Sequence, residues 1–283
     1  MEAGGARGSP GGRLPPELPG FPAPLSPIVA AMTKTVMITG AGSGFGKMAS
    51  LALAERGHEV IATTETDGQA DLLRSEAPQL TVERVDITSD DVAKVLAWDI
   101  DVLINNAGAG QTGPLADVPL DRVRRLFEVN VFGTLAVTQQ VLKGMVAKGS
   151  GRVIIMSSIS GVMSAPTFGP YSMTKHALEA MGKTMRSELA PLGIDVTLMN
   201  PGPYQTGFND RMADSMWEWF GEASLNASAS DSFREFGRFV TGNQMDPAEV
   251  SQRMVELTEA ETTEENNFVP PEIRALVTGA LEG

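Results

Sequence analysis

The stretch KTVMITGAGSGFGKMASLALAER, Lys34–Arg56, decides the fold of this chain. Its first part, Lys34–Thr39, is short, apolar and rich in β-branched residues, which is typical of a buried strand. The glycine-rich turn Gly40–Gly46 follows, and the helix-forming run Lys47–Arg56 comes next. A strand, a glycine turn and a helix form a phosphate-binding arrangement, because glycines let the backbone approach a pyrophosphate and the first helical amides face its negative charge.

The glycine spacing narrows the kind of ligand. It reads Thr-Gly-x-x-x-Gly-x-Gly from Thr39 to Gly46, and so differs from the commoner Gly-x-Gly-x-x-Gly dinucleotide fingerprint. The turn also lacks the Gly-Lys-Ser/Thr ending of a nucleoside-triphosphatase loop, which argues against ATP chemistry. Taken alone, a glycine-rich loop is weak support for any one ligand.

Short runs of strand character recur along the chain, with helical patterns between them. The expected strands are residues 35–39, 59–64, 80–85, 102–105, 152–157 and 195–199. This alternation predicts an α/β protein with a doubly wound parallel sheet and helices on both faces, the three-layer α/β/α Rossmann arrangement. Ligands of such sheets bind beyond the carboxyl ends of the strands. Residues suited to ligand contact follow five of these strands: Gly40, Asp86, Asn106, Ser158 and Pro201.

The pentad Tyr171-Ser-Met-Thr-Lys175 indicates a proton-transfer site. Residues four apart share a face of a helix, so the Tyr171 hydroxyl and the Lys175 ammonium can converge on one point. Ser158 lies 13 positions before Tyr171, after an expected strand. The alternative is an exposed helix that carries Tyr171 and Lys175 by accident, and the pentad alone does not separate the two.

Together these motifs resemble those of the short-chain dehydrogenase/reductase family in its compact single-domain form. The matching positions cover residues 34 to about 206 in the family's order: Thr39-Gly40-x-x-x-Gly44-x-Gly46, Asp86, Asn105 to Gly108, Asn130, Ser158, Tyr171-x-x-x-Lys175, Pro201-Gly202 and Thr206. The resemblance implies an NAD(P)-dependent oxidoreductase that transfers a hydride between the cofactor and a secondary alcohol or ketone. A catalytically silent, nicotinamide-sensing regulatory protein is the alternative, although such sensors usually lose the tyrosine or the lysine.

The resemblance implies four catalytic residues. Tyr171 is expected to take the alcohol proton, Ser158 to orient the substrate oxygen, and Lys175 to hold the nicotinamide ribose. Lys175 and an oxidised nicotinamide are expected to lower the pKa of Tyr171 by roughly two to three units from its usual value near 10. Asn130 is expected to anchor a water that connects Lys175 to solvent. The alternative for Asn130 is a helix amide with a structural partner.

The same resemblance implies a set of cofactor-binding residues: Gly40, Ser43, Gly44, Phe45, Gly46, Glu65, Asp86, Ile87, Asn106, Ala107, Gly108, Tyr171, Lys175, Pro201, Gly202 and Thr206. Glu65 lies 19 residues after Gly46, where a carboxylate can accept hydrogen bonds from the adenosine ribose and repel a 2′-phosphate. Ser43 stands where NADP-dependent relatives often carry a basic residue. Both residues favour NAD over NADP. Alternatively, Thr64 occupies the usual acidic position and Glu65 points into solvent.

Composition sets the bounds of the protein. Residues 1–31 are rich in Gly and Pro and are expected to form a disordered extension before a natural start at Met32, with one dehydrogenase domain over residues 32–283. The chain has no cysteine, and we expect no metal site. Its formal net charge of -13 argues against nucleic acid and membranes as partners. A cytoplasmic location is expected. His58 is expected at the surface.

Residues 207–245 are expected to form a lid over the substrate. This segment contains Phe208, Met212, Met216, Trp217, Trp219, Phe220, Phe233, Phe236 and Phe239, a density that favours an apolar or aromatic small-molecule substrate. The alternative is that these side chains pack the lid onto the domain or form a subunit contact.

A homodimer or homotetramer is also expected, because residues 126–148 and the helix that begins near Tyr171 resemble the family's pairing helices. Val131, Leu135, Val141 and Met145 recur at near-helical spacing and could form its apolar face. The alternative is that this face packs on the sheet.

Overall fold

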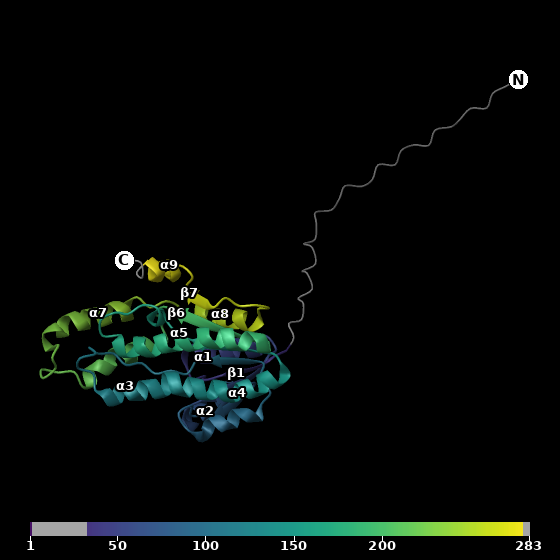
Figure 1. Cartoon of the computed structure of the whole chain (residues 1–283), viewed down its shortest axis with the longest axis horizontal. Coiled ribbons are helices and arrows are strands. Elements are labelled where there is room, and N and C mark those ends of the chain that lie inside the picture. Colours follow the sequence, from purple (N-terminus) through teal and green to yellow (C-terminus); the bar gives the residue numbers. More distant parts are fainter. Residues whose placement is uncertain (2–32, 280–283) are drawn as a thin grey trace. The chain divides into compact units, whose positions relative to one another are not determined.

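A parallel sheet of seven strands forms the centre of this computed structural model, which describes Met1 and residues 33–279 (Figure 1). The strands are β1 (Thr35–Ile38), β2 (Glu59–Thr64), β3 (Thr81–Arg84), β4 (Val102–Asn105), β5 (Gly151–Met156), β6 (Ile194–Pro201) and β7 (Asn266–Val269). Their order is β3-β2-β1-β4-β5-β6-β7, and every neighbouring pair is parallel. The doubly wound sheet is therefore confirmed. The expectations for residues 2–31 and for a start at Met32 fall outside the described residues.

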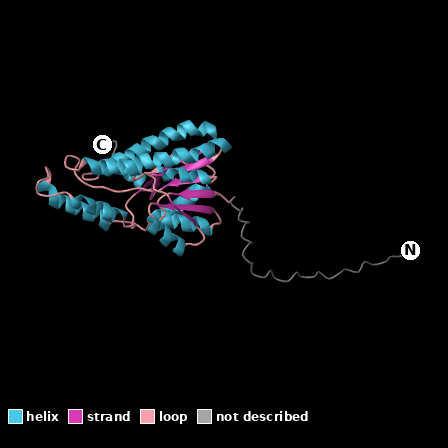
Figure 2. Cartoon of the chain, turned by 90° about the horizontal axis from the view of Figure 1, so that it is seen from below, coloured by secondary structure: helices cyan, strands magenta, loops and turns pink. Residues whose placement is uncertain are grey.

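Helices cover both faces of the sheet (Figure 2). Side chains of β1 alternate between these faces because successive residues of a strand point to opposite sides. Val36 packs in a core with helices α1 (Gly44–Glu55), α2 (Asp67–Glu76) and α8 (Ala248–Glu259). Met37 packs in the opposite core with α4 (Thr134–Lys148) and α5 (Gly169–Leu189). Both side chains are fully buried, as expected for a central strand of a three-layer fold.

The remaining elements lie between the strands in sequence or follow β7. A 3₁₀ helix (Asp90–Ala97) joins β3 to β4, and α3 (Leu120–Phe127) passes through a π-helical turn (Glu128–Gly133) into α4. The 3₁₀ turn Ile159–Gly161 leads from β5 towards α5, and the 3₁₀ turn Ala190–Leu192 leads from α5 to β6. Later elements are α6 (Phe208–Ser215), 3₁₀ turns Met216–Glu218 and Ala227–Ala229, α7 (Ser230–Gly242) and α9 (Ile273–Gly279). Across residues 33–279, no helix combines the length and apolar character that a membrane crossing requires.

The edge strand β7 was not predicted. Its sequence, Asn-Asn-Phe-Val, begins with two asparagines, a residue type depleted in strands. Tertiary contacts fix it instead: the Asn267 Nδ2 donates to Thr197 Oγ1 at 2.7 Å and to the Leu198 carbonyl at 3.1 Å. Side-chain hydrogen bonds to β6 therefore override a weak local preference.

The interpretation of His58 as a surface residue is wrong. Its side chain is buried, its Nδ1 accepts a hydrogen bond from the Lys34 amide, and its Nε2 lies 3.2 Å from Glu259. Glu259 ends helix α8, which packs beside α1. The burial of His58 thus depends on a helix 200 residues away, which local sequence does not reveal.

The expected apolar face of α4 is divided. Val141 and Met145 are buried in the core against the sheet, as the alternative interpretation had it. Val131 and Leu135 are only partly buried. The exposed apolar side chains here are Phe132 in the π-helical turn before α4, Val146 on α4 and Met173 on α5.

Candidate active site

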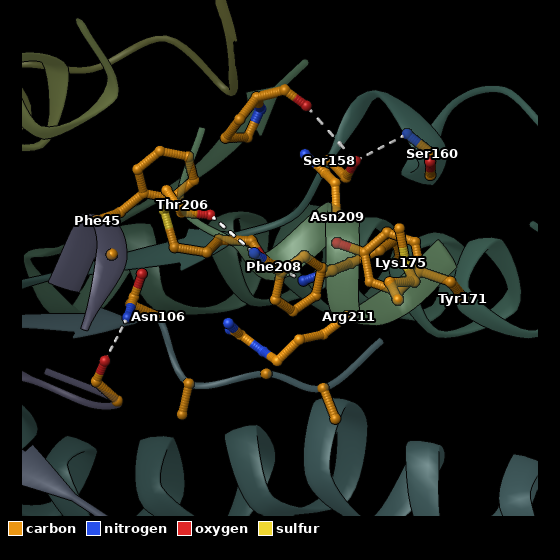
Figure 3. Close-up of a pocket in the computed structure, with 18 of the residues that line it drawn as sticks. Phe45, Asn106, Ser158, Ser160, Tyr171, Lys175, Thr206, Phe208, Asn209 and Arg211 are labelled. Carbon is orange, nitrogen blue, oxygen red and sulfur yellow. Dashed lines mark hydrogen bonds between the residues drawn. The ribbon is translucent and has the colours of Figure 1, made fainter. Parts of the chain in front are cut away.

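One cavity of about 710 Å³ lies at the carboxyl ends of the strands (Figure 3). Sixteen of the expected residues line it: Gly40, Ser43, Gly44, Phe45, Glu65, Asp86, Ile87, Asn106, Ala107, Gly108, Ser158, Tyr171, Lys175, Pro201, Gly202 and Thr206. Gly46 and Asn130 do not line it. Residues from the ends of six strands, β1 to β6, therefore meet in one space.

The glycine turn is shaped by close backbone approach. Gly40 has a φ of +66°, and a Cβ there would lie 2.8 Å from the Ala107 Cα. Gly44 has a φ of +54°, and a Cβ there would meet the Thr206 side chain at 3.3 Å. Both positions therefore require glycine on conformational and steric grounds.

Gly46 has a packing role. A Cβ at Gly46 would lie 2.5 Å from the Asn106 Nδ2, which donates to the carbonyls of Thr39 and Gly40 at 2.9 and 3.1 Å. Gly46 thus permits the Asn106 amide to hold the turn in place. At the start of α1, the N-cap residue Ser43 makes no side-chain capping bond. The amides of the first turn are consequently available for an anion, and this cradle fits the pyrophosphate of a dinucleotide.

The end of β2 places a carboxylate at the cavity. Thr64 is buried and its hydroxyl donates to the Thr66 carbonyl, so its side chain belongs to the fold. Glu65 is exposed and lines the cavity. Asp86 lines the same end, and its Oδ1 accepts from the amide and hydroxyl of Thr88 at 2.9 and 2.7 Å. These two acidic side chains fit the adenosine part of a dinucleotide.

Ser158, Tyr171 and Lys175 meet where β5 ends and α5 begins. The Ser158 Oγ accepts from the Ser160 amide at 3.1 Å and contacts the Pro201 carbonyl at 3.5 Å. The Lys175 Nζ lies 5.5 Å from the centre of the Tyr171 ring and donates to the Met156 carbonyl at 2.7 Å. All three side chains are at least nine-tenths buried.

Burial dominates the ionisation of this group. It raises the pKa of Tyr171 above its usual value, and a hydrogen bond with Ser158 offsets part of that rise. Burial also lowers the pKa of Lys175 to about 8, while the negative charge of Glu179 opposes the change. The expected lowering of the Tyr171 pKa by Lys175 together with an oxidised nicotinamide concerns the cofactor-bound enzyme and stays a prediction. In the protein alone, desolvation of the buried phenol is the largest influence on its pKa.

Asn130 makes structural hydrogen bonds. Its Oδ1 accepts from the Ala109 amide at 2.7 Å, and its Nδ2 donates to the Ala109 carbonyl and to the Thr174 hydroxyl, each at 3.0 Å. It sits in the π-helical turn between α3 and α4, a distortion common near functional sites. Asn130 therefore links the segment that follows β4, through Ala109, to α5, through Thr174 beside Lys175.

The aromatic residues of segment 207–245 form two groups. Phe208, Met212, Phe236 and Phe239 line the cavity, together with Phe168 and Met163 from outside the segment. The Phe208 ring centre lies 5.8 Å from that of Tyr171. These residues give the cavity an apolar region beside the tyrosine.

The second group packs on itself, and none of its rings lines the cavity. Phe220 makes edge contacts with Trp217, Trp219 and Phe233, with ring centres 5.8 to 6.0 Å apart. Trp219 also fills the space beside Gly113. Trp217, Trp219 and Phe220 do not line the cavity, which agrees with the alternative that such side chains pack the segment onto the domain.

Several lining residues were not expected from the sequence, and Arg211 is the most polar of them. It comes from α6, lines the cavity, and points towards the space between Phe208 and Asn106 (Figure 3). Asn209 and Asn243 also line it. No motif marks these positions, because α6 and α7 lie beyond the last recognisable residue, Thr206.

Comparison with known proteins identifies the family. The family model described as short chain dehydrogenase matches residues 34–217. An uncharacterized oxidoreductase, YusZ, of Bacillus subtilis is 36% identical over 244 residues, which are 79% of this chain and 84% of YusZ. Human retinol dehydrogenase 8 is 32% identical over 196 residues, 65% of this chain and 63% of that protein.

Solved structures of short-chain dehydrogenases have the same fold as this chain. A short-chain dehydrogenase from Streptomyces avermitilis superposes with a TM-score of 0.75 at 29% identity, covering 88% of this chain and 92% of its own. One from Burkholderia cenocepacia, solved in complex with NADP, gives 0.70 at 25% identity, covering 87% and 92%. This chain belongs to the short-chain dehydrogenase/reductase family and is an oxidoreductase of the kind that acts on CH–OH groups.

Proposed function

We propose that this enzyme transfers a hydride between NAD(H) and an apolar or aromatic secondary alcohol or ketone. The observation that carries the proposal is the convergence of Ser158, Tyr171 and Lys175 on a cavity that has a glycine cradle at one side and phenylalanines at the other. A bound nicotinamide supplies or accepts the hydride. The residues of the chain orient the substrate oxygen and move its proton.

Tyr171 exchanges the proton with the substrate oxygen. In reduction, its raised pKa keeps the hydroxyl protonated until the carbonyl oxygen gains charge, so Tyr171 donates as that charge develops. The Ser158 hydroxyl donates a second hydrogen bond to the same oxygen. Lys175 bears a positive charge below pH about 8 and stabilises the tyrosinate that remains.

The cofactor is held by groups along the strand ends. Gly40, Ser43 and Gly44 with the first turn of α1 bind the pyrophosphate, and Asp86 and Ile87 contact the adenine. Glu65 accepts hydrogen bonds from the adenosine ribose, which favours NAD because a 2′-phosphate would lie beside this carboxylate. Asn106, Ala107 and Gly108 line the path between the two ends. Lys175 holds the nicotinamide ribose, while Pro201, Gly202 and Thr206 hold the carboxamide.

The substrate class follows from the apolar region beside Tyr171. Phe168, Phe208, Phe236 and Phe239 offer ring surface that a small polar alcohol would leave exposed to water. The name of human retinol dehydrogenase 8 refers to an apolar alcohol, which is consistent with this choice. Helices α6 and α7 act as the lid that excludes water from the hydride path.

The test is a panel of aromatic, steroid and terpenoid alcohols offered with NAD or NADP, followed at 340 nm. We expect turnover with bulky apolar alcohols and with NAD preferred. Binding of NADH without turnover of any alcohol or matching ketone would support the alternative, a nicotinamide-sensing protein.

We also infer a homodimer or homotetramer formed through α4 and α5. Exposed Phe132, in the π-helical turn that leads into α4, and exposed Met173 of α5 supply apolar surface there. Light scattering at micromolar protein is expected to give a multiple of the mass of 29.9 kDa, and Phe132→Glu is expected to reduce it. A clean monomer would contradict this inference.

A further inference from the structure

One helical turn after Lys175 lies a buried carboxylate. It has no part in the proton exchange proposed for Tyr171. Glu179 of α5 is only 5% exposed. One carboxylate oxygen accepts from the Asn200 Nδ2 at 2.6 Å, and the other accepts from the Asn266 Nδ2 at 2.8 Å. The Lys183 Nζ lies 3.4 Å from it at the protein surface. Burying a carboxylate is costly unless it is bonded and paired, so its placement calls for a reason.

The same carboxylate is connected to Ser158. The Asn200 Nδ2 that bonds Glu179 also donates to the Ser158 carbonyl at 3.3 Å. The turn after Ser158 lies against α5, because a Cβ at Gly161 would meet the Glu179 Cγ at 3.0 Å and the Lys175 carbonyl at 3.1 Å. Glu179 therefore bonds to Asn200, which supports Ser158. It also lies beside Gly161, where the turn after Ser158 meets the backbone of Lys175.

Glu179 is also the charge that opposes the desolvation of Lys175. The groups from other elements that bond to Lys175 or Glu179 are neutral: the Met156 carbonyl of β5, Asn200 of β6 and Asn266 of β7. On α5 itself, Tyr171 and Lys183 are the other titratable groups that face this pair. Removing the Glu179 charge would leave the Lys175 ammonium with dipoles alone.

We propose that Glu179 is a positioning residue for the reaction: its buried carboxylate, one turn along α5 from Lys175, is the counter-charge of that ammonium and holds the Ser158 turn against the same helix. The link to catalysis rests on the proposed function. The electrostatic coupling of Glu179 to Lys175 does not, because it is measurable in the protein alone.

The direct test is an NMR titration of Lys175 in protein labelled with ¹³C at the lysine Cε, with the signal assigned from Lys175→Arg. In the wild-type protein the midpoint is expected near pH 8. Glu179→Gln keeps the shape of the side chain but removes its charge, and we expect the midpoint to fall by about one pH unit. Glu188→Gln removes an exposed charge from the same helix and is expected to leave the midpoint unchanged.

Two further variants separate charge from packing. Lys183→Met acts at an exposed position and removes a competing positive charge, so the Lys175 midpoint is expected to rise by a few tenths of a unit. This variant carries the test if Glu179→Gln does not fold. Asn266→Ala removes a donor but keeps the carboxylate, and is expected not to lower the midpoint. An unchanged midpoint in Glu179→Gln or Lys183→Met, or an equal fall in Asn266→Ala, would overturn the proposal.

The catalytic consequence is read from pH profiles of reduction, on the ketone that matches the best alcohol of the panel. In Glu179→Gln, the alkaline limb of kcat is expected to move to lower pH by the same amount as the Lys175 midpoint, with little change in KM. A shifted midpoint without any shift of the limb would overturn the catalytic link alone, and no turnover in the wild-type protein would instead count against the proposed function.

Discussion

The strand-end side of the cavity and segment 207–245 face each other, yet their side chains are held in different ways. Ser158, Tyr171 and Lys175 are buried and bonded to the backbone or to one another. Phe208 of α6 and Phe236 of α7, which line the cavity from this segment, are only partly buried. The first side fixes the geometry of proton transfer, and the second shapes the space around a substrate.

The comparison also separates two kinds of aromatic residue within the segment. Phe208, Phe236 and Phe239 line the cavity, whereas Trp217, Trp219 and Phe220 form a cluster of their own. Both sets look alike in composition. Only their tertiary contacts decide which set meets a ligand, so changes to the two sets should have different effects.

The largest effect is expected from Tyr171→Phe on the strand-end side. Loss of the titrating oxygen should lower kcat by about a thousandfold, while cofactor affinity changes less than about twofold. Lys175→Ala should lower both kcat and cofactor affinity, since it removes a charge and a ribose contact. Steady-state kinetics paired with cofactor titration measure the two effects, and substantial turnover in Tyr171→Phe would remove Tyr171 as the acid and base.

The pH dependence of reduction tests the buried charge. Lys175 is charged below its pKa of about 8 and loses the charge as pH rises through that value. The kcat of ketone reduction should therefore hold below pH about 8 and fall by up to about tenfold per pH unit above it. In Lys175→Arg this limb should vanish from whatever activity remains, because guanidinium stays charged. A flat wild-type profile up to pH 10 would contradict the role of the charge.

A substitution at the end of β2 is expected to have an effect of intermediate size, on cofactor preference. Glu65→Arg should shift the preference from NADH towards NADPH by roughly tenfold or more, because it replaces a repelling carboxylate with a cation. Thr64→Ala, at the neighbouring buried position, is the matched control and should leave the preference unchanged. Tighter binding of NADPH than NADH by the unmodified enzyme would show that the interpretation of Glu65 is wrong.

The smallest effect is expected in segment 207–245, and it divides the two aromatic sets. Phe236→Ala should raise KM severalfold for bulky apolar alcohols and little for small ones. Phe220→Ala should lower the free energy of unfolding by about 3 kcal/mol, because it leaves a void among three rings, and should alter KM similarly for both sizes. Equal effects of the two variants on size selectivity would remove the distinction between the sets.

Much of the fold could be predicted because its signals are local. The run before Gly40, the period of the helices and the order of the motifs predict the sheet, and six strands lie where expected. Strand β7 was missed because Asn266 and Asn267 are held by side-chain bonds to residues far away in sequence.

The residues of the site also divide into those that local sequence predicts and those that it does not. Residues such as Gly40, Ser158 and Lys175 follow strand ends or occupy helix turns, so spacing brings them together. Arg211 and Phe236 lie on helices whose placement depends on packing, and composition alone could not separate them from Trp217 or Trp219. The ionisation of Tyr171 was also beyond the sequence, because desolvation depends on what surrounds the ring.

The most direct test of the central claim is the transfer of deuterium from NADH labelled at C4 of the nicotinamide to a bulky apolar ketone from the panel. Mass spectrometry of the alcohol would locate the label. The account predicts deuterium on the carbinol carbon with the wild-type enzyme, from one of the two C4 epimers, and almost none with Tyr171→Phe under the same saturation of cofactor. Bound NADH that never transfers its deuterium to any ketone would contradict it.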